Sequence, residues 1–96
     1  MTVLQIEHAV RSFEAWRAAF ESDPVGRRAG GVQRYRIYRR VDDPNYVALD
    51  LEFGDRATAE TFRAALERLW RSPEAAPALG GAPRTRIVDV VEHETV

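Results

Sequence analysis

The sequence predicts an α+β fold of the ferredoxin-like type, a four-stranded antiparallel sheet with both helices on one face. Three observations indicate this fold. Four segments alternate apolar and polar residues as strands do, two segments repeat apolar residues at helical spacing, and their order is strand, helix, strand, strand, helix, strand. The length of 96 residues fits one domain, which we expect to span residues 1–96.

The first strand is predicted over residues 2–10, and the first helix follows from Phe13 onward. One face of this strand carries Leu4, Ile6, His8 and Val10. Ser12 stands at the N-cap position, and the apolar residues of the helix recur every three or four positions: Phe13, Trp16, Ala19 and Phe20. The helix is expected to end before the turn sequence DPVG at residues 23–26.

The arginine-rich sequence RYRIYRR at residues 34–40 and the segment from Tyr46 to Phe53 predict a β-hairpin. A cluster of turn residues, Asp42 to Asn45, separates its two strands. The second strand has one apolar face, made of Val47, Leu49, Leu51 and Phe53. We expect this face to pack against the helices.

The second helix is predicted over Arg56 to Trp70, with Asp55 as its N-cap. Its apolar stripe consists of Thr58, Phe62, Leu66 and Leu69. A short helix is expected to begin at Ser72 and to end by Gly80. The last strand is expected over Arg84 to Glu94.

The charged residues of the hairpin indicate its register. Arg34 and Arg36 share a face of the first hairpin strand, and Asp50 and Glu52 share the polar face of the second. A register that keeps the apolar faces together places these arginines opposite or diagonal to the acids. Two interpretations remain open: the charges specify the register of a buried or half-buried sheet face, or the arginines bind an anionic ligand.

Composition excludes several classes of function. The net charge is −1 and the arginines are spread along the chain, so no nucleic-acid-binding surface is indicated. The chain has no cysteine, and its two histidines, His8 and His93, stand far apart, so no metal site is predicted. No apolar run is long enough for a signal peptide or a membrane span, and we expect a cytoplasmic protein without a membrane partner.

The chain also resembles a known superfamily. It carries H-x-V, then SFEAWRAAF, then GGV followed by R-x-Y-R-x-x-D-D-P-N-x-V, and later a helix, SPE and a last strand. Over essentially the whole chain, this pattern resembles the small bacterial proteins of the antibiotic-biosynthesis-monooxygenase-like, dimeric α/β-barrel superfamily. The resemblance implies a homodimer in which two sheets pack face to face into one barrel, with any ligand site between the sheet and the helices of each protomer. A chain this short also gains from burying a sheet face against a second copy.

The superfamily includes cofactor-independent oxygenases, haem-degrading enzymes, polyketide cyclases and muconolactone isomerases. The haem-degrading members have an axial histidine in the short helix after the second long helix. That helix offers Leu79 here, and there is no histidine between Ser72 and Gly81. We therefore expect neither haem nor another cofactor.

His8 is the predicted catalytic residue, because it lies near the end of the first strand on an apolar face. In an apolar cavity an imidazole stays neutral and can take a proton from a phenol or enol near pH 7. The expected walls of the substrate site are Trp16, Tyr35, Phe62, Leu66 and Trp70. Arg36 and Tyr38 are alternative polar groups if the hairpin register is shifted by one residue. The other interpretation is that His8 is a hydrogen-bonded core histidine and the aromatic residues are core packing.

These inferences favour a small-molecule tailoring enzyme, a cofactor-independent monooxygenase or cyclase that acts on an aromatic or polyketide-like compound. Its expected partners are a second copy of the chain and a small apolar aromatic ligand. The alternative is a non-catalytic ligand-binding or structural homodimeric domain. An open cavity beside His8 favours the enzyme, and a cavity filled by side chains favours the alternative.

Overall fold

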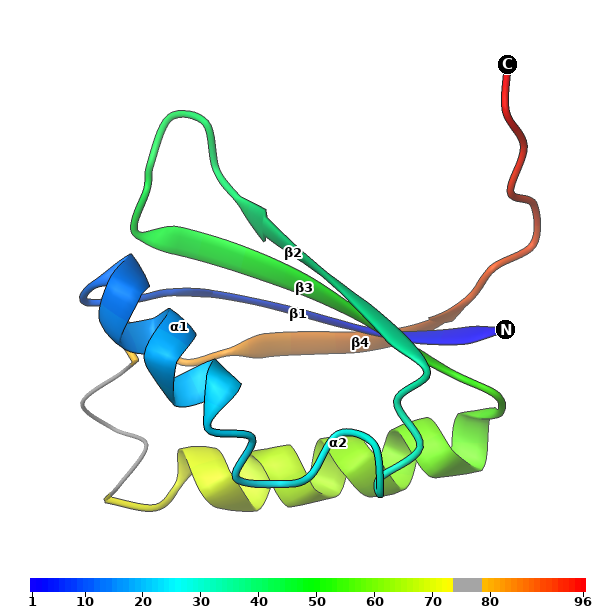
Figure 1. Cartoon of the computed structure of the whole chain (residues 1–96), viewed down its shortest axis with the longest axis horizontal. Coiled ribbons are helices and arrows are strands. Elements are labelled where there is room, and N and C mark those ends of the chain that lie inside the picture. Colours follow the sequence, from blue (N-terminus) through cyan, green and yellow to red (C-terminus); the bar gives the residue numbers. More distant parts are fainter. Residues whose placement is uncertain (74–78) are drawn as a thin grey trace.

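The computed structural model of the chain describes residues 1–73 and 79–96 (Figure 1). Its elements follow the predicted order: β1 (Thr2–Ala9), α1 (Phe13–Glu21), β2 (Arg34–Arg39), β3 (Tyr46–Phe53), α2 (Arg56–Trp70) and β4 (Arg84–Asp89). The strands form one sheet in the order β2-β3-β1-β4, and each neighbouring pair is antiparallel. This arrangement confirms the ferredoxin-like α+β fold expected from the sequence.

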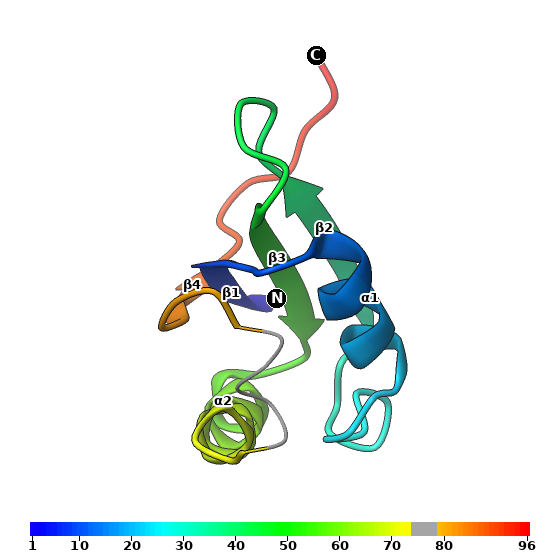
Figure 2. The same ribbon diagram turned by 90° about the vertical axis from the view of Figure 1, so that its left-hand side faces the viewer.

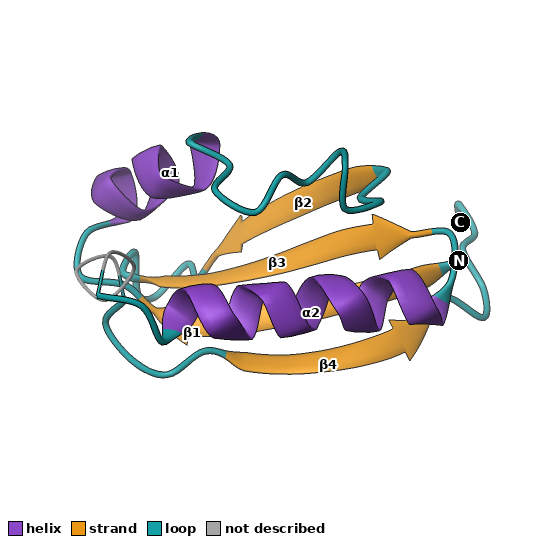
Figure 3. Cartoon of the chain, turned by 90° about the horizontal axis from the view of Figure 1, so that it is seen from below, coloured by secondary structure: helices purple, strands orange, loops and turns teal. Residues whose placement is uncertain are grey.

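Both helices lie on the same side of the sheet (Figure 2). Figure 3, a view from below, shows α2 running lengthwise under the sheet and α1 lying near one end of β2 and β3. Each helix begins at its predicted cap: the Ser12 hydroxyl accepts a hydrogen bond from the Ala15 N–H at 3.3 Å, and the Asp55 carboxylate accepts one from the Thr58 N–H at 2.8 Å. Within residues 1–73 and 79–96, no helix is long and apolar enough to cross a membrane.

The two central strands determine which side chains face the helices. In their antiparallel register Leu4 lies opposite Leu51, Ile6 opposite Leu49, and His8 opposite Val47. Because side chains alternate along a strand, this register turns the predicted apolar faces of β1 and β3 toward the helices together. The buried core combines these strands with side chains from both helices: Leu4, Ile6, Val47, Leu49, Leu51, Phe53, Trp16, Ala59 and Phe62.

The hairpin of β2 and β3 has the register expected from its charges. Arg34 lies opposite Glu52 and Arg36 opposite Asp50, on the sheet face turned away from the helices. The Arg34 guanidinium is 3.0 Å from the Glu52 carboxylate. Asp50 accepts a hydrogen bond from the Tyr38 hydroxyl at 2.7 Å. Arg36 and Tyr38 therefore lie on the face opposite the helices, as the unshifted register requires.

The last strand is shorter than expected, because it ends at Asp89 and not at Glu94. The cause is the length of its partner. β1 begins at Thr2, which pairs with Asp89, and one further hydrogen bond of 3.0 Å joins the Val90 N–H to the Met1 carbonyl. Residues after Val90 have no backbone partner within the described chain, and the C-terminal segment extends away from the sheet (Figure 1).

Two further predictions concern the end of β1 and the short helix after α2. β1 ends at Ala9, and Val10 forms an isolated bridge with Leu79. The short helix predicted from Ser72 to Gly80 falls largely on residues 74–78, which lie outside the described residues.

Truncation of Phe53 tests the core packing. Phe53 is fully buried, and its ring lies 5.5 Å from the ring of Phe62. Phe53→Ala should lower the free energy of unfolding by about 3–5 kcal/mol, because it leaves a cavity in close-packed surroundings. Urea denaturation measures this loss. Val41→Ala, at a fully exposed position, is the control and should change stability by no more than about 0.5 kcal/mol. Similar small losses for both variants would contradict the packing described.

Candidate functional site

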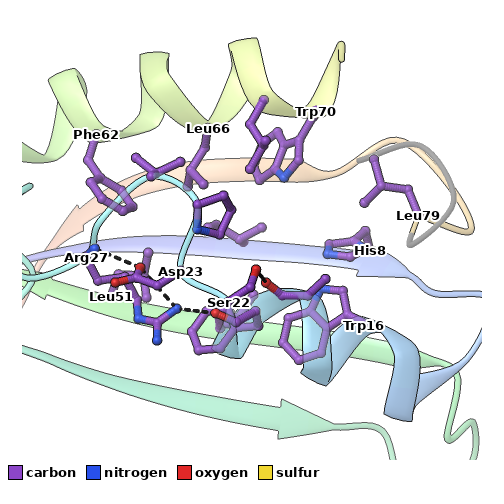
Figure 4. Close-up of a pocket in the computed structure, with 17 residues that line it drawn as sticks. His8, Trp16, Ser22, Asp23, Arg27, Leu51, Phe62, Leu66, Trp70 and Leu79 are labelled. Carbon is purple, nitrogen blue, oxygen red and sulfur yellow. Dashed lines mark hydrogen bonds and ion pairs between the residues drawn. The ribbon is translucent and has the colours of Figure 1, made fainter. Parts of the chain in front are cut away.

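A cavity of about 250 Å³ lies between the sheet and the helices (Figure 4). The 17 residues that line it come from β1, β3, both helices, the segment after α1, and Leu79. Most of these side chains are apolar or aromatic, and only a few carry polar groups. Concave, mainly apolar cavities with a few polar groups are typical of small-molecule sites.

His8 brings an imidazole to the wall of this cavity. The residue is 3% exposed, and its Nδ1 is 2.8 Å from the backbone carbonyl oxygen of Ala9. A carbonyl oxygen only accepts hydrogen bonds, so we assign the proton to Nδ1. In the neutral ring this tautomer leaves a lone pair on Nε2. No hydrogen bond joins Nε2 to any residue in the described part of the chain.

The surroundings of His8 favour the neutral imidazole. Burial lowers its pKa below the ordinary value of 6.5, and the hydrogen bond to the Ala9 carbonyl opposes this effect to a smaller degree. The imidazole and the Trp16 ring meet in an edge-type contact, with an angle of 65° between their planes and centroids 6.1 Å apart. The arrangement therefore offers a neutral base, able to accept a proton from an acidic O–H or C–H group that enters the cavity.

Four of the five predicted wall residues line the cavity with His8. Trp16 comes from α1, where it stacks on Phe20 with centroids 5.4 Å apart. The other three come from the sheet-facing side of α2: Phe62, Leu66 and Trp70. Helical spacing places them in one row, which is why their sequence pattern was informative.

Tyr35 is the predicted wall residue that does not line the cavity. It is 49% exposed, and its ring packs edge-on against Phe20 at a centroid distance of 5.1 Å. Tyr35 belongs to the edge strand β2, while Phe20 itself lines the cavity. Tyr35 lies opposite Leu51, on the helix-facing side of the sheet, but outside the cavity lining. Arg36 and Tyr38 also lie outside the cavity lining, since the hairpin register is the unshifted one.

The segment after α1 contributes polar wall residues that the sequence did not identify. Ser22, Asp23 and Arg27 all line the cavity (Figure 4). Asp23 has a positive φ of 53°, and its side chain accepts a hydrogen bond from the Arg27 N–H at 2.9 Å. The Arg27 side chain then donates to the Phe20 carbonyl at 2.6 Å, near the end of α1. The turn sequence DPVG indicated the end of the helix, but nothing periodic indicated that this turn folds back over the cavity.

Metal ligands are not grouped in the residues that the structure describes. Among them, no set of three or more His, Asp or Glu side chains is placed to hold a metal ion. Besides the indole N–H groups of Trp16 and Trp70, the polar side chains of the cavity wall carry one imidazole, one carboxylate, one guanidinium and one hydroxyl: His8, Asp23, Arg27 and Ser22.

Comparison by sequence gives no relative, because no protein-family model and no curated protein matches the chain significantly. Solved structures do match. A Nitrosomonas europaea protein that carries the provisional name antibiotic biosynthesis monooxygenase has a TM-score of 0.72 and 22% identity, over 96% of this chain and 100% of that one. The cofactor-independent oxygenase SnoaB from Streptomyces nogalater has a TM-score of 0.74 and 11% identity, over 96% and 94%.

A dimeric ferredoxin-like protein from an uncultured marine organism is also similar, with a TM-score of 0.72 and 20% identity over 97% of this chain and 98% of that one. At these identities the similarity establishes the fold alone. It confirms, at the level of fold, the resemblance to antibiotic-biosynthesis-monooxygenase-like proteins.

The buried imidazole should make stability depend on pH. The pKa of His8 is lower in the folded state than in the unfolded state. As the pH falls below 6.5, the unfolded chain therefore takes up a proton at this ring while the folded chain still has a neutral imidazole. The contribution of the neutral imidazole to the free energy of unfolding is therefore fully present above that pH. It decreases on acidification, by up to about 1.4 kcal/mol per pH unit. Urea denaturation between about pH 7.5 and pH 5 measures this slope.

His8→Gln should remove this component of the slope, whereas His93→Gln, in the exposed C-terminal segment, should retain it. Equal slopes in wild type and His8→Gln would show that the buried imidazole does not set the pH dependence.

Proposed function

We propose that this protein is a small-molecule tailoring enzyme, a cofactor-independent monooxygenase or cyclase that acts on an aromatic or polyketide-like compound, with His8 as its general base. The fold shared with SnoaB and with antibiotic-biosynthesis-monooxygenase-like proteins supports the class. One observation carries the proposal: His8 is held by the Ala9 carbonyl as a neutral imidazole in the wall of an apolar, aromatic cavity. A base poised near neutral pH is what proton abstraction from a phenol or enol needs.

In the oxygenase reaction, His8 accepts the proton of a phenol or enol, and the electron-rich anion reacts with dioxygen. The substrate itself supplies the electrons. For a ring methylene activated by that hydroxyl, the balance is R₂CH₂ + O₂ → R₂C=O + H₂O. Two C–H bonds break, one oxygen atom stays in the product, and the other leaves as water with both hydrogens, so no external reductant is needed.

In the cyclase reaction, the same base takes a proton from a carbon between two carbonyl groups. The enolate attacks another carbonyl carbon of the same molecule, and loss of water completes the ring without an oxidant. Both reactions benefit from a site that excludes bulk water, and the walls formed by Trp16, Phe62 and Trp70 are suited to that role.

The alternative is a non-catalytic ligand-binding or structural homodimeric domain. The observation that favours it is the aromatic packing along α1 at one side of the cavity. There the Trp16 ring packs against Phe13 on one side and against Phe20 on the other. Such packing stabilises a fold whether or not chemistry takes place. Binding of a ligand without turnover distinguishes this alternative from the enzyme.

We also propose that a second copy covers the sheet face turned away from the helices. No helix of the described chain packs over this face in Figures 1 and 2, and each of its three strand carboxylates accepts a hydrogen bond within the face. The paired groups are Arg34 with Glu52, Tyr38 with Asp50, and Tyr46 with Glu7. A face whose carboxylates already have partners can be buried at lower cost than one with unpaired charges. The similar marine protein is dimeric, which supports the same assembly here.

Oxygen uptake tests the enzymatic proposal. With an electron-rich phenol or anthrone and a chelator present, the protein should consume one O₂ per substrate oxidised. His8→Gln should lower kcat by about 10²–10⁴-fold, the usual contribution of a positioned base. His93→Gln, which removes the exposed histidine, should leave kcat unchanged. Titration with hemin should produce no Soret shift.

Three results would count against this proposal. Oxygen uptake that survives His8→Gln intact would remove the imidazole from the mechanism. A saturable one-to-one hemin complex would contradict the absence of a cofactor. Binding without turnover of any phenol, anthrone or polyketide mimic would favour the non-catalytic alternative.

Light scattering at micromolar concentration tests the assembly and should give the mass of a dimer. A stable interface of this kind usually buries about 1,200–2,000 Å². Ala48→Arg introduces a bulky charge on β3, one of the two central strands of the proposed interface, and should produce monomers that remain folded. Ala57→Arg, on the exposed side of α2, is the matched control and should remain dimeric. A monomeric wild type, or dimers of both variants, would contradict this interface.

A further inference from the structure

Arg27 is a cationic wall residue that the proposed chemistry leaves unused. In Figure 4 its side chain lies at one end of the cavity, near Phe62 and Leu51, while His8 lies toward the other end, near Leu79. The Arg27 side chain as a whole is about four-fifths buried, with 19% of it exposed. A cation in mainly apolar surroundings is unfavourable unless its N–H groups find acceptors.

The described residues satisfy Arg27 only in part. Its Nη1 donates to the Phe20 carbonyl at 2.6 Å, and the guanidinium carbon lies 3.9 Å from the centre of the Phe20 ring. The nearest carboxylate oxygen, from Asp23, is 3.5 Å from Nη1. That separation exceeds the roughly 2.7–2.9 Å of a charge-assisted hydrogen bond. A guanidinium has five N–H donors, and within the described residues only Nη1 has a hydrogen-bond acceptor. The other nitrogens reach solvent, because no buried side-chain nitrogen or oxygen there lacks a partner.

Asp23 forms only a long ion pair with the Arg27 guanidinium, at 3.5 Å. Its carboxylate accepts a hydrogen bond from the Arg27 backbone N–H at 2.9 Å, which fixes the turn. Its side chain is 37% exposed, about twice the exposure of the Arg27 side chain. Water therefore screens Asp23 more than Arg27, and an acidic group inside the cavity would reach the guanidinium directly.

The size of the cavity limits the ligand. An apolar protein cavity of about 150 Å³ accommodates benzene, and pockets for drug-sized molecules begin near about 300 Å³. The present cavity, at about 250 Å³, lies between these values. As it stands it fits one or two aromatic rings with small substituents, so a phenol or naphthol is a better probe than a three-ring anthrone, which would require the segment after α1 to move.

We infer that the ligand of this cavity is an aromatic acid of one or two rings, whose carboxylate binds Arg27 and whose phenolic hydroxyl faces His8. The inference rests on the proposed function, because it assigns the substrate class of the same site. A planar carboxylate can accept two parallel hydrogen bonds from a guanidinium. A phenolic hydroxyl at the other end can donate to the unprotonated Nε2 of His8.

Calorimetric titration with 6-hydroxy-2-naphthoate and 2-naphthol tests the inference, because the two probes differ only in the carboxylate. The wild type should bind the acid about 10–100-fold more tightly, the usual gain from a hydrogen bond to a charged group. Arg27→Gln should abolish this preference and change the affinity for naphthol little. Arg28→Gln removes the same charge from the exposed neighbouring position and should keep the preference.

Equal affinity of the wild type for the two probes, or a preference that survives in a folded Arg27→Gln variant, would overturn the inference. If Arg27 is purely structural, Arg27→Gln should lower the affinity for both probes equally, and this result would also overturn the inference. If Arg27→Gln does not fold, Arg27→Lys replaces it: a lysine lacks the planar fork, so most of the preference should disappear, and full retention would overturn the inference.

Oxygen uptake in the same samples separates this inference from the proposed function. Binding of the acid that depends on Arg27, without uptake, would reject the oxygenase and leave the ligand class standing. Uptake with phenols of either kind, without preference for the acid, would reject the ligand class and leave the oxygenase standing.

Discussion

The antiparallel register of β1 and β3 is the constraint on which the rest of the structure depends. It sets Leu4 against Leu51 and His8 against Val47, so the apolar faces of both strands turn toward the helices together. A slip of one residue would send every one of these side chains to the opposite face. The same register therefore builds the core and brings a histidine, unusual in such surroundings, to the wall of the cavity. Fold and candidate chemistry share one cause.

The segment between α1 and β2 encloses the cavity, and its conformation depends on local interactions. Gly30 lies against the ring of Phe62, where an added Cβ would come within 2.5 Å of a ring carbon, so this close approach requires glycine. Asp23 and Arg27 connect the start of the segment to the end of α1. The Arg27 side chain thus joins this turn to the end of α1 within the wall of the cavity.

Residues whose role follows from periodicity were predicted from the sequence. Alternation identified the faces of β1 and β3, helical spacing identified the row that contains Phe62 and Trp70, and paired charges indicated the hairpin register. Periodicity does not indicate how far a residue lies from a cavity. Tyr35 was expected in the cavity wall, but on the edge strand it lies outside the cavity lining. Arg27 was missed because it lies in an aperiodic turn, and the last strand was overestimated because its end depends on the length of its partner.

The protonation state of His8 is the central claim, and long-range ¹H–¹⁵N correlation spectra of the imidazole test it most directly. At pH 7 the account predicts a neutral ring with the proton on Nδ1, bonded to the Ala9 carbonyl, and a pKa held below its ordinary value of 6.5 by burial. Addition of 6-hydroxy-2-naphthoate should shift the Nε2 resonance. An imidazolium at pH 7, or a neutral ring protonated on Nε2, would contradict the account.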